Sequence, residues 1–544
     1  MPIQPTYPGV YIEEISSGVR TITGVATSIT AFVGRARKGP DEQPVTCFNF
    51  GDYERIFGGL WNKSTMSFAV RDFFLNGGGV AVIVRIHNAA TRSVIRLPTG
   101  VADPNDEISL EAVNPGSWGD KVSVTIDYNT KDKNDLTPVL FNITINEENG
   151  ASEKFFNMSA DSTQSSYLPR VLEQNSNLLR VKKDAGGAYI MANKRPVQLS
   201  EISAVKILTA PSMNPVAAIA SGTDGSHIGD NDIFATAGME ADKKGMYLLE
   251  KTDLFNLLCI PPYSSFDGSV LLPDDKPTDV TKALLSKADA YCIRRRAMLL
   301  IDAHSTWNTM QKASDKFTDA INPFPGITSQ YAAIFFPRLK QANPLMKNMV
   351  EEFVPCGAVA GVFARTDAQR GVWKAPAGQD ATLKGVDSLT VPLTDNENGV
   401  LNQLGINCLR AFPVYGRLVW GSRTLEGADR LASEWKYIPV RRTALFIEES
   451  LYRGTKWVVF EPNDESLWAQ IRLNVGAFMH NLFRQGAFQG SSPRDAYFVK
   501  CDKETTTQND INAGIVNIVV GFQPLKPAEF VMIKIQQLAG QIDS

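Results

Sequence analysis

The sequence lacks paired cysteines, clustered histidines and long apolar runs. Its six cysteines each stand alone, which argues against a disulfide framework and predicts buried thiols in a reducing compartment. The four histidines include no i, i+4 pair, so the helix-borne zinc motif is missing. No stretch approaches the ~18 consecutive apolar residues of a membrane-spanning helix, and the first residues lack the basic and apolar regions of a secretory signal. We therefore expect the chain to fold in a cytoplasm, without direct membrane insertion.

The chain also lacks a strong excess of charge. Its 544 residues carry 55 Lys and Arg against 58 Asp and Glu, a formal net charge of −3. Nucleic-acid binders more often show a basic excess, so no nucleic-acid partner is expected. The 43% of hydrophobic and 21% of charged residues are normal for a globular protein with a sizeable core. The length predicts about three to four domains of ~150 residues each.

Motifs that carry chemistry are scarce. Gly34–Gly39 follows a predicted strand like a phosphate loop, but Pro40 comes next, where the motif needs Lys followed by Ser or Thr. A basic turn is the simpler interpretation. Asp302, His304 and Ser305 follow another predicted strand, a place that holds catalytic groups in α/β enzymes. They keep a hydrolase with accessory β domains open as an alternative, although no G-x-S-x-G motif is present. We predict a protein that is not an enzyme, with no catalytic residue, cofactor or metal site.

The periodicity of apolar residues predicts a multidomain α+β protein. Val122–Ile126 and Phe141–Asn146 alternate with period two, as antiparallel strands with one solvated face do. Between residues 254 and 353, apolar strands alternate with segments of helical pattern, which predicts an α/β layer with largely parallel strands. The helices of this layer are expected at Asp279–Arg296, with Asp279 as the N-cap, at Thr309–Ile321 and at Pro344–Phe353.

From residue 399 onward the chain is predicted to hold strands, one amphipathic helix and a strand-rich end. The helix begins at Asn463–Glu465, which supply a cap and first-turn acids. Its other face carries Arg472 and Arg484. Phe530–Ile535 has a strand-like sequence near the terminus. Apolar residues recur along the helix at spacings of three and four and form one stripe: Leu467, Ile471, Val475, Phe478 and Leu482.

These patterns divide the chain into six segments. The predicted fold has an α/β core layer, an inserted antiparallel β-rich domain, and extended N- and C-terminal strand arms. The segments are an N-terminal extended arm (1–25), the first part of the core (26–95), the inserted β-rich outer domain (96–208), an α/β domain (209–365), the C-terminal core (366–525) and a C-terminal arm (526–544).

Eight short segments, in order along the chain, resemble contractile-tail sheath proteins of phages and related injection particles. One such match would be weak, but eight in sequence indicate the family. The segments are Tyr7–Glu14, Thr30–Gly34, Asn114–Gly119, Gly371–Ala377, Trp420–Thr424, Val440–Arg442, Phe460–Asn463 and Pro527–Phe530.

The resemblance implies a structural subunit that polymerises as stacked hexameric rings around an inner tube. The sheath would contract and drive the tube through a target cell envelope, without a cofactor. Its partners would be copies of itself, the inner tube protein, the baseplate, and tail-terminator or cap proteins. The particle would assemble in the cytoplasm of a bacterial host, as part of a virion tail or an extracellular injection particle. A static self-assembling shell protein is the other open alternative.

The resemblance also assigns roles to residues. The terminal arms would add strands to sheets in neighbouring subunits, and the C-terminal core would face the tube, with Arg472 and Arg484 as the tube-facing residues. Since both arms and the core lie on one chain, a phage tail or an injection particle is favoured over a two-chain secretion sheath. The residues expected in the arms are Val10, Tyr11, Ile12, Glu13 and Ile15 at the N-terminus, and Phe530, Val531, Met532, Ile533, Lys534 and Ile535 at the C-terminus.

Overall fold

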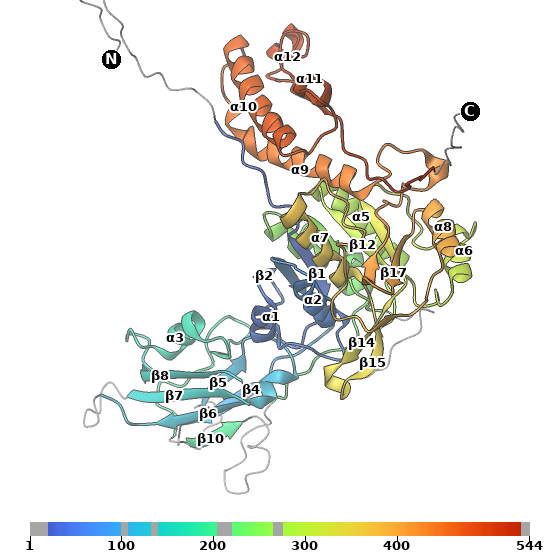
Figure 1. Cartoon of the computed structure of the whole chain (residues 1–544). Helices are drawn as coiled ribbons and strands as arrows, with labels where there is room; N and C mark the ends of the chain where they lie inside the picture. The colour runs from blue at the N-terminus through green and yellow to red at the C-terminus, as the bar shows by residue number, and fades with distance from the viewer. Residues whose placement is uncertain are drawn as a thin grey trace, which may run out of the picture.

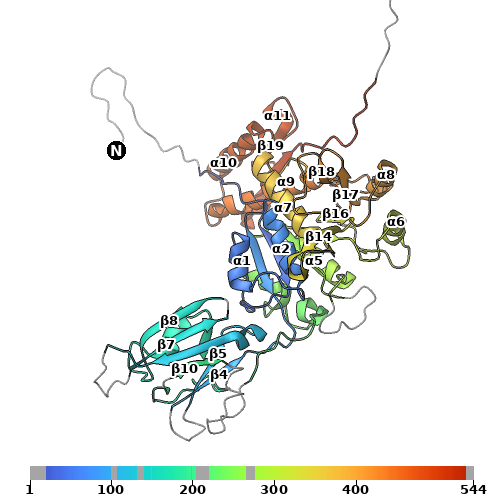
Figure 2. The ribbon, with the colours of Figure 1, turned by 60° about the horizontal axis from the view of Figure 1, so that its bottom comes forward.

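The structure is a computed structural model, and it describes residues 20–99, 107–131, 140–148, 150–197, 199–203, 220–264 and 276–534. A central α/β part lies between a β-rich domain at one end and a helical C-terminal part at the other (Figures 1 and 2). The predicted multidomain α+β class is therefore confirmed. The predicted arm residues at the N-terminus, and Ile535, lie outside the described residues.

The central part is built on an eight-stranded sheet of order β18-β17-β13-β12-β11-β1-β3-β2, as far as the described residues go. The six inner strands are parallel and the two edge strands antiparallel. Three segments of the predicted division contribute strands to this one sheet. The strands are β1 (Thr30–Gly34), β2 (Val45–Cys47), β3 (Ala81–Arg85), β11 (Leu257–Cys259), β12 (Met298–Asp302), β13 (Ala332–Phe336), β17 (Asn407–Phe412) and β18 (Gly416–Val419).

Helices cover both faces of the sheet, so β1, β3, β12 and β13 are buried along their whole length, as continuous apolar runs predict. Gly357 lets two helices on one face approach closely, because a Cβ there would overlap the backbone oxygen of Ala69. On one face lie α1 (Phe50–Phe57), α2 (Thr65–Leu75) and α7 (Cys356–Arg370), and on the other α5 (Lys282–Arg295), α6 (Met310–Thr318) and α8 (Asp395–Leu404).

The helix predicted at Pro344–Phe353 does not form, and that prediction was wrong. Lys347 and Asn348 have positive φ angles of 53° and 61°, which stop a helix after one 3-10 turn. The chain then turns back, and the long-range antiparallel pairing overrides the local apolar pattern. The resulting three-stranded sheet consists of β14 (Leu339–Asn343), β15 (Met349–Phe353) and β16 (Ser388–Leu389).

Asp279 is not the N-cap of α5, which corrects a second prediction. Thr281 holds that position, and its side chain accepts a hydrogen bond from the N–H of Leu284. Asp279 instead accepts hydrogen bonds from Ser305 and from the guanidinium of Arg338. Thr and Asp have the same capping chemistry, so the sequence could not separate two candidates two residues apart.

The inserted domain consists of two antiparallel sheets around one apolar core that includes Trp118. This confirms the predicted antiparallel strands, and the first strand begins at Val94. The elements are β4 (Val94–Pro98), β5 (Glu107–Ala112) and β9 (Leu179–Val181) in one sheet, β10 (Leu199–Ser203), β6 (Val122–Asp127), β7 (Leu140–Glu147) and β8 (Ser152–Ser159) in the other, and α3 (Leu168–Asn175).

The C-terminal part holds two long helices rather than one. The predicted helix is α10, capped by Asp464, and its apolar stripe is buried. The other helix, α9, was missed, because Pro439 and β-branched residues at its start resemble a strand, although Pro is tolerated in a first turn. No helix in the described ranges is long and apolar enough to cross a membrane. The elements are α9 (Ile438–Gly454), α10 (Glu465–Arg484), α11 (Pro493–Ala496), β19 (Tyr497–Lys500), α12 (Gln508–Asn512) and β20 (Val519–Phe522).

Candidate functional site: the anchors of the two terminal segments

The C-terminal segment is held to the core by a buried ion pair. Arg423 donates from Nε and Nη2 to the two carboxylate oxygens of Glu529, at 2.7 and 2.6 Å, and the hydroxyl of Tyr437 donates to the same carboxylate at 3.1 Å. The side chain of Arg423 is fully buried. We call Arg423, Tyr437 and Glu529 the C-terminal anchor. Bidentate pairing fixes the direction of the carboxylate as well as its position.

Arg423 also has partners within the core. Its Nη1 atom donates to the carbonyl oxygen of Asn402 at 2.8 Å and to the carboxylate of Asp429 at 2.9 Å. Its backbone N–H donates to the side chain of Asn407 at 2.6 Å. These contacts of Nη1 and of the backbone N–H help the core to position the guanidinium toward Glu529.

Charge pairing controls the protonation of this anchor. Burial alone would raise the pKa of Glu529, but the hydrogen bonds and the charge of Arg423 outweigh it and hold that pKa below the usual carboxyl value. Burial and the neighbouring carboxylate raise the pKa of Tyr437 to about 12, so its hydroxyl stays protonated and able to donate. The anchor is therefore an ion pair at neutral pH.

A second buried ion pair holds the N-terminal segment. Arg442, on α9, donates to both oxygens of Asp367 on α7, at 2.9 and 2.6 Å, and both side chains are almost fully buried. Thr27 joins them: its hydroxyl donates to Asp367 at 2.7 Å, and its carbonyl oxygen accepts from Arg442 at 2.9 Å. We call Thr27, Asp367 and Arg442 the N-terminal anchor.

Before this anchor the N-terminal segment runs along α9 and α10 (Figure 1). The N–H of Arg20 donates to the side chain of Asn474 on α10 at 2.9 Å, and its guanidinium lies 4.6 Å from the ring centroid of Trp457. Ile22 is buried in the apolar cluster of α10, against Gly454 at the end of α9. The chain is therefore fixed from residue 20 to β1 along one helical surface.

Beyond Glu529 the described chain leaves the core. Phe530, Val531, Met532 and Ile533 are 73–86% exposed, and no strand is assigned to Phe530–Lys534. Four consecutive apolar side chains exposed in this way are unusual for a protomer that acts alone. The role of these residues in an arm stays a prediction.

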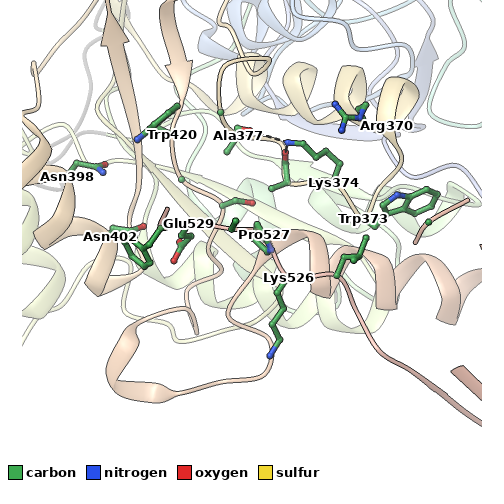
Figure 3. Close-up of a pocket in the computed structure, with 18 of the residues that line it drawn as sticks. Arg370, Trp373, Lys374, Ala377, Asn398, Asn402, Trp420, Lys526, Pro527 and Glu529 are labelled. Atoms are coloured by element: carbon green, nitrogen blue, oxygen red, sulfur yellow. Dashed lines mark hydrogen bonds between the residues drawn. The ribbon is translucent and has the colours of Figure 1, made fainter. Parts of the chain in front are cut away.

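A cavity of about 720 Å³ lies between the C-terminal segment and the core. Trp373 and Lys374 follow α7, Trp420 follows β18, and Lys526 and Pro527 belong to the C-terminal segment (Figure 3). The amine of Lys374 donates to two backbone carbonyl oxygens at the rim of this cavity. Burial and a neighbouring arginine lower the pKa of Lys374.

The sheet of β19 and β20 lies against α10 and has only two strands in the described structure. Tyr497 and Val499 join the apolar cluster of α10, whereas Phe498 on the other face is half exposed. Phe498 lies over Gly521 of β20, where a Cβ would overlap its ring. A two-stranded sheet is marginal by itself, and each of its strands leaves one edge without a partner strand here.

Known proteins resemble this chain over most of its length. The family model of the phage tail sheath protein central domain matches residues 270–425, and that of the phage tail sheath C-terminal domain matches residues 432–537. The tail sheath protein of Vibrio phage KVP40 is 28% identical over 180 residues, which are 32% of this chain and 25% of that protein. The putative prophage major tail sheath protein of Pseudomonas aeruginosa is 27% identical over 174 residues, 31% of this chain and 42% of that protein.

Residues 270–425 and 432–537 therefore match tail sheath domains, and the chain is similar to tail sheath proteins of phages and prophages. The alignments to these curated relatives span less than half of their length. The fold is shared with the contracted helical sheath of the anti-feeding prophage, with a TM-score of 0.54 and 22% identity over 98% of this chain and 99% of that one. A sheath tail protein from Listeria innocua has a TM-score of 0.58 at 13% identity, over 92% of this chain and 96% of that one.

Segments that resemble tail sheath proteins and are far apart in the sequence meet at the anchors. Trp420–Thr424 supplies Arg423, and Pro527–Phe530 supplies Glu529. Val440–Arg442 supplies the arginine of the N-terminal anchor. Sequence reasoning marked these segments but missed Tyr437 and Asp367, because nothing local to either residue indicates a partner so distant in the sequence.

Of the two residues predicted to face the tube, Arg472 lies in the first half of α10 and Arg484 is its last residue. Arg472 pairs with Glu465 at 2.7 Å and donates to the carbonyl oxygen of Cys501. Arg484 lies exposed in the last turn. A tube-facing role for Arg472 and Arg484 stays a prediction.

In the described structure, the side chains of Asp302, His304 and Ser305 are not hydrogen-bonded to one another. Ser305 donates to Asp279 at 2.5 Å, while His304 faces Thr306 at 2.9 Å. Asp302 accepts from the N–H of Cys356, and burial raises its pKa to about 6. The space beside Asp302 is about 10 Å³, no more than one water fills.

The segment Gly34–Gly39, which begins like a phosphate loop, presents backbone carbonyl oxygens where a phosphate loop presents N–H groups. Arg85 donates to the backbone carbonyl oxygens of Ala36, Gly39 and Pro115, at 3.1, 2.6 and 2.7 Å. A phosphate site needs inward-pointing N–H groups, whereas Gly34–Gly39 turns carbonyl oxygens toward a buried cation. This arrangement agrees with the basic-turn interpretation.

Proposed function

We propose that this chain is the structural subunit of a contractile tail sheath, stacked as hexameric rings around an inner tube. The observation that carries the proposal is the C-terminal segment, which is fixed at Glu529 and exposes four apolar residues directly after it. A fixed base followed by a free apolar strand is suited to pairing with another copy. The partners are other copies of the chain, the inner tube, the baseplate and the terminator or cap proteins.

The sheet of β19 and β20 is the acceptor in this proposal. Its two unpaired edges offer N–H and C=O groups to strands that arrive from neighbouring subunits. Pairing with an arm on each edge would raise the sheet from two strands to four, the size at which a sheet becomes stable. The half-exposed Phe498 on its outer face would gain neighbours in the same step.

Contraction follows from anchored segments joined by strand pairing. Because both anchors are buried ion pairs inside the protomer, the core moves as one body while the main-chain pairing between copies keeps its register. Linked copies also have a high effective concentration for each other, so individual contacts can break and re-form during the movement. The sheath shortens, and the tube is driven through the envelope of the target cell without an enzymatic step.

Two truncations test the proposal. Deleting residues 1–19 spares Arg20 and its contacts, and ending the chain after Phe530 spares Glu529, so both variants should fold. We expect soluble protomers that form no long sheaths, whereas the full chain at the same concentration forms hollow striated tubes by negative-stain microscopy. Normal tubes from both truncated chains would contradict strand exchange through the terminal segments.

A further inference from the structure

The turn between α9 and α10 holds an aromatic side chain away from the protein. Phe460 is fully exposed, and Val459 beside it is 63% exposed. The N–H of Glu461 donates to the carbonyl oxygen of Val458, which closes a tight turn. Val459 has φ −65° and ψ 129°, and Phe460 has φ 71°, as in a type II turn. That position favours Gly or Asn, so a phenylalanine there is strained and gains nothing from the fold of its own protomer.

Acidic residues follow this aromatic residue. Glu461, Asp464 and Glu465 are exposed. Asp464 also caps α10, which fixes the turn relative to the helix. We call Val459–Glu465 the acidic knob. Lys456 precedes it, with its amine over the ring of Tyr452.

The cavity under the C-terminal segment is lined by cations, in contrast to the acidic knob. Among the described residues that line it, the cations are Arg370, Lys374 and Lys526, and its acid Glu529 is already paired with Arg423. Arg370 lowers the pKa of Lys374 in addition to the effect of burial, so an incoming carboxylate would relieve repulsion between two cations.

The lining of this cavity also has an apolar wall and an unused polar group. Trp373 and Trp420 give aromatic surface for a phenyl ring (Figure 3). Ser422 also borders the cavity, and its buried hydroxyl has no hydrogen-bond partner in the described structure.

The knob and the cavity lie at opposite ends of α10. Glu465 begins the helix, whereas Gln485 and Gly486, directly after its last turn, line the cavity. A helix of 20 residues separates its ends by ~30 Å. A protomer therefore cannot place its own Phe460 in its own cavity.

We propose that the acidic knob of one copy inserts Phe460 into the Trp373–Trp420 cavity of the next copy. The carboxylates of the knob then face Arg370, Lys374 and Lys526. A contact between two different surfaces of the same protein is heterologous, and it propagates from copy to copy without closing on a pair. This contact rests on the self-assembly proposed above and adds to it a site that does not use the terminal segments.

The first test replaces Phe460 with Asn, which suits the turn and removes the ring. We expect the protomer to be as stable as the original chain, while the concentration at which tubes form rises about ten-fold or more, the effect of losing a well-packed aromatic contact. Val414→Asn is the matched control, because Val414 is 85% exposed on the hairpin of β17 and β18. An unchanged assembly threshold for Phe460→Asn would overturn the proposal.

The second test traps the contact. The variant Phe460→Cys with Ala377→Cys places one thiol on the knob and one at the cavity, while the cysteines of the chain itself are buried. Mild oxidation of tubes should give a ladder of dimers, trimers and longer species on a non-reducing gel. Phe460→Cys paired with Ser152→Cys on the inserted domain should stay monomeric.

The outcomes separate the two proposals. Tubes that form without cross-links and with an unchanged threshold leave the sheath function standing and overturn the knob contact. A full chain that never forms tubes contradicts the sheath function itself. A dimer without longer species would mean a closed pair and would also overturn the head-to-tail contact.

Discussion

At the residue scale, each anchor uses a buried arginine to hold one terminal segment. Arg423 binds Glu529 of the C-terminal segment bidentately, and Arg442 binds Asp367 of α7 bidentately while it also donates to Thr27 of the N-terminal segment. Lysine could not replace either of them, because a single ammonium cannot match two carboxylate oxygens in a fixed plane. Each anchor fixes its terminal segment to the core of the protomer.

Removing the charge of Glu529 should release the C-terminal segment. In Glu529→Gln the guanidinium of Arg423 stays buried beside Asp429 alone, and breaking a buried pair from one side costs about 3–5 kcal/mol. We expect the anisotropy of a dye on Lys534→Cys to fall while the amides of β12 keep their protection from hydrogen exchange. Asp253→Asn is the control, because its pair with Arg453 is 83% exposed on the aspartate side and should contribute under ~1 kcal/mol. Equal anisotropy in both variants would contradict the anchor.

Acid should release the same segment. The pKa of Glu529 in the folded protein lies below its ordinary value of 4.5, so the stabilisation is fully present above that value. It is lost as the pH falls through the lowered folded pKa, when the carboxylate takes up a proton. The anisotropy of a dye on Lys534→Cys should fall in this acid range. The same dye in a Glu529→Gln chain should report a mobile segment at every pH, and a pH transition there would assign the effect to another group.

At the scale of elements, the sequence predicted those helices and strands whose deciding contacts lie within one segment. It missed those that depend on contacts between residues far apart in the sequence. β6, β7 and α10 were predicted because their apolar periodicity, and for α10 also its cap, lies within each segment. The hairpin of β14 and β15 was missed because its pairing and its positive-φ turn outweigh a local helical pattern. The anchors were marked only as separate segments, since Arg423 and Glu529 meet over a separation of 106 residues.

Close packing of α2 on α7 should make Gly357 hard to replace. In Gly357→Ala the new methyl group would overlap the backbone of Ala69, which can move only with α2. We expect a loss of about 1–3 kcal/mol in the free energy of unfolding, measured by denaturant titration. Gly476→Ala on α10 is the control, because nothing lies within 4 Å of its new methyl group, and Ala should stabilise that helix by about 1 kcal/mol. A similar result at both positions would contradict close helix contact.

At the scale of the whole molecule, the inserted domain is attached at one narrow place. The N–H of Val94 donates to the carbonyl oxygen of Ala220 at 2.9 Å, and Thr91 pairs with Thr223, so the outgoing and returning strands lie side by side. The domain has its own apolar core. It is therefore a unit of folding distinct from the central sheet.

Excision of this domain should leave the rest folded. Replacing residues 95–219 by a short Gly-Ser linker joins two ends that already touch, and removes from the core the pair of Lys38 with Glu147 and the hydrogen bond from Arg85 to the carbonyl oxygen of Pro115. We expect a soluble protein with cooperative unfolding and with the strand and helix content of the remaining parts by circular dichroism. Aggregation of the shortened chain, with the isolated domain also unfolded, would show that the two parts fold only together.

The position of β1 has a consequence for synthesis on the ribosome. β1 lies between β3 and β11, so its second neighbour is made about 230 residues after it, a delay of roughly 10–45 s at 5–20 residues per second. During that time an apolar strand with one open edge waits while the inserted domain is translated and folds. The nascent chain is then most exposed to aggregation, and a chaperone that binds extended apolar strands would protect it until Leu257–Cys259 emerges.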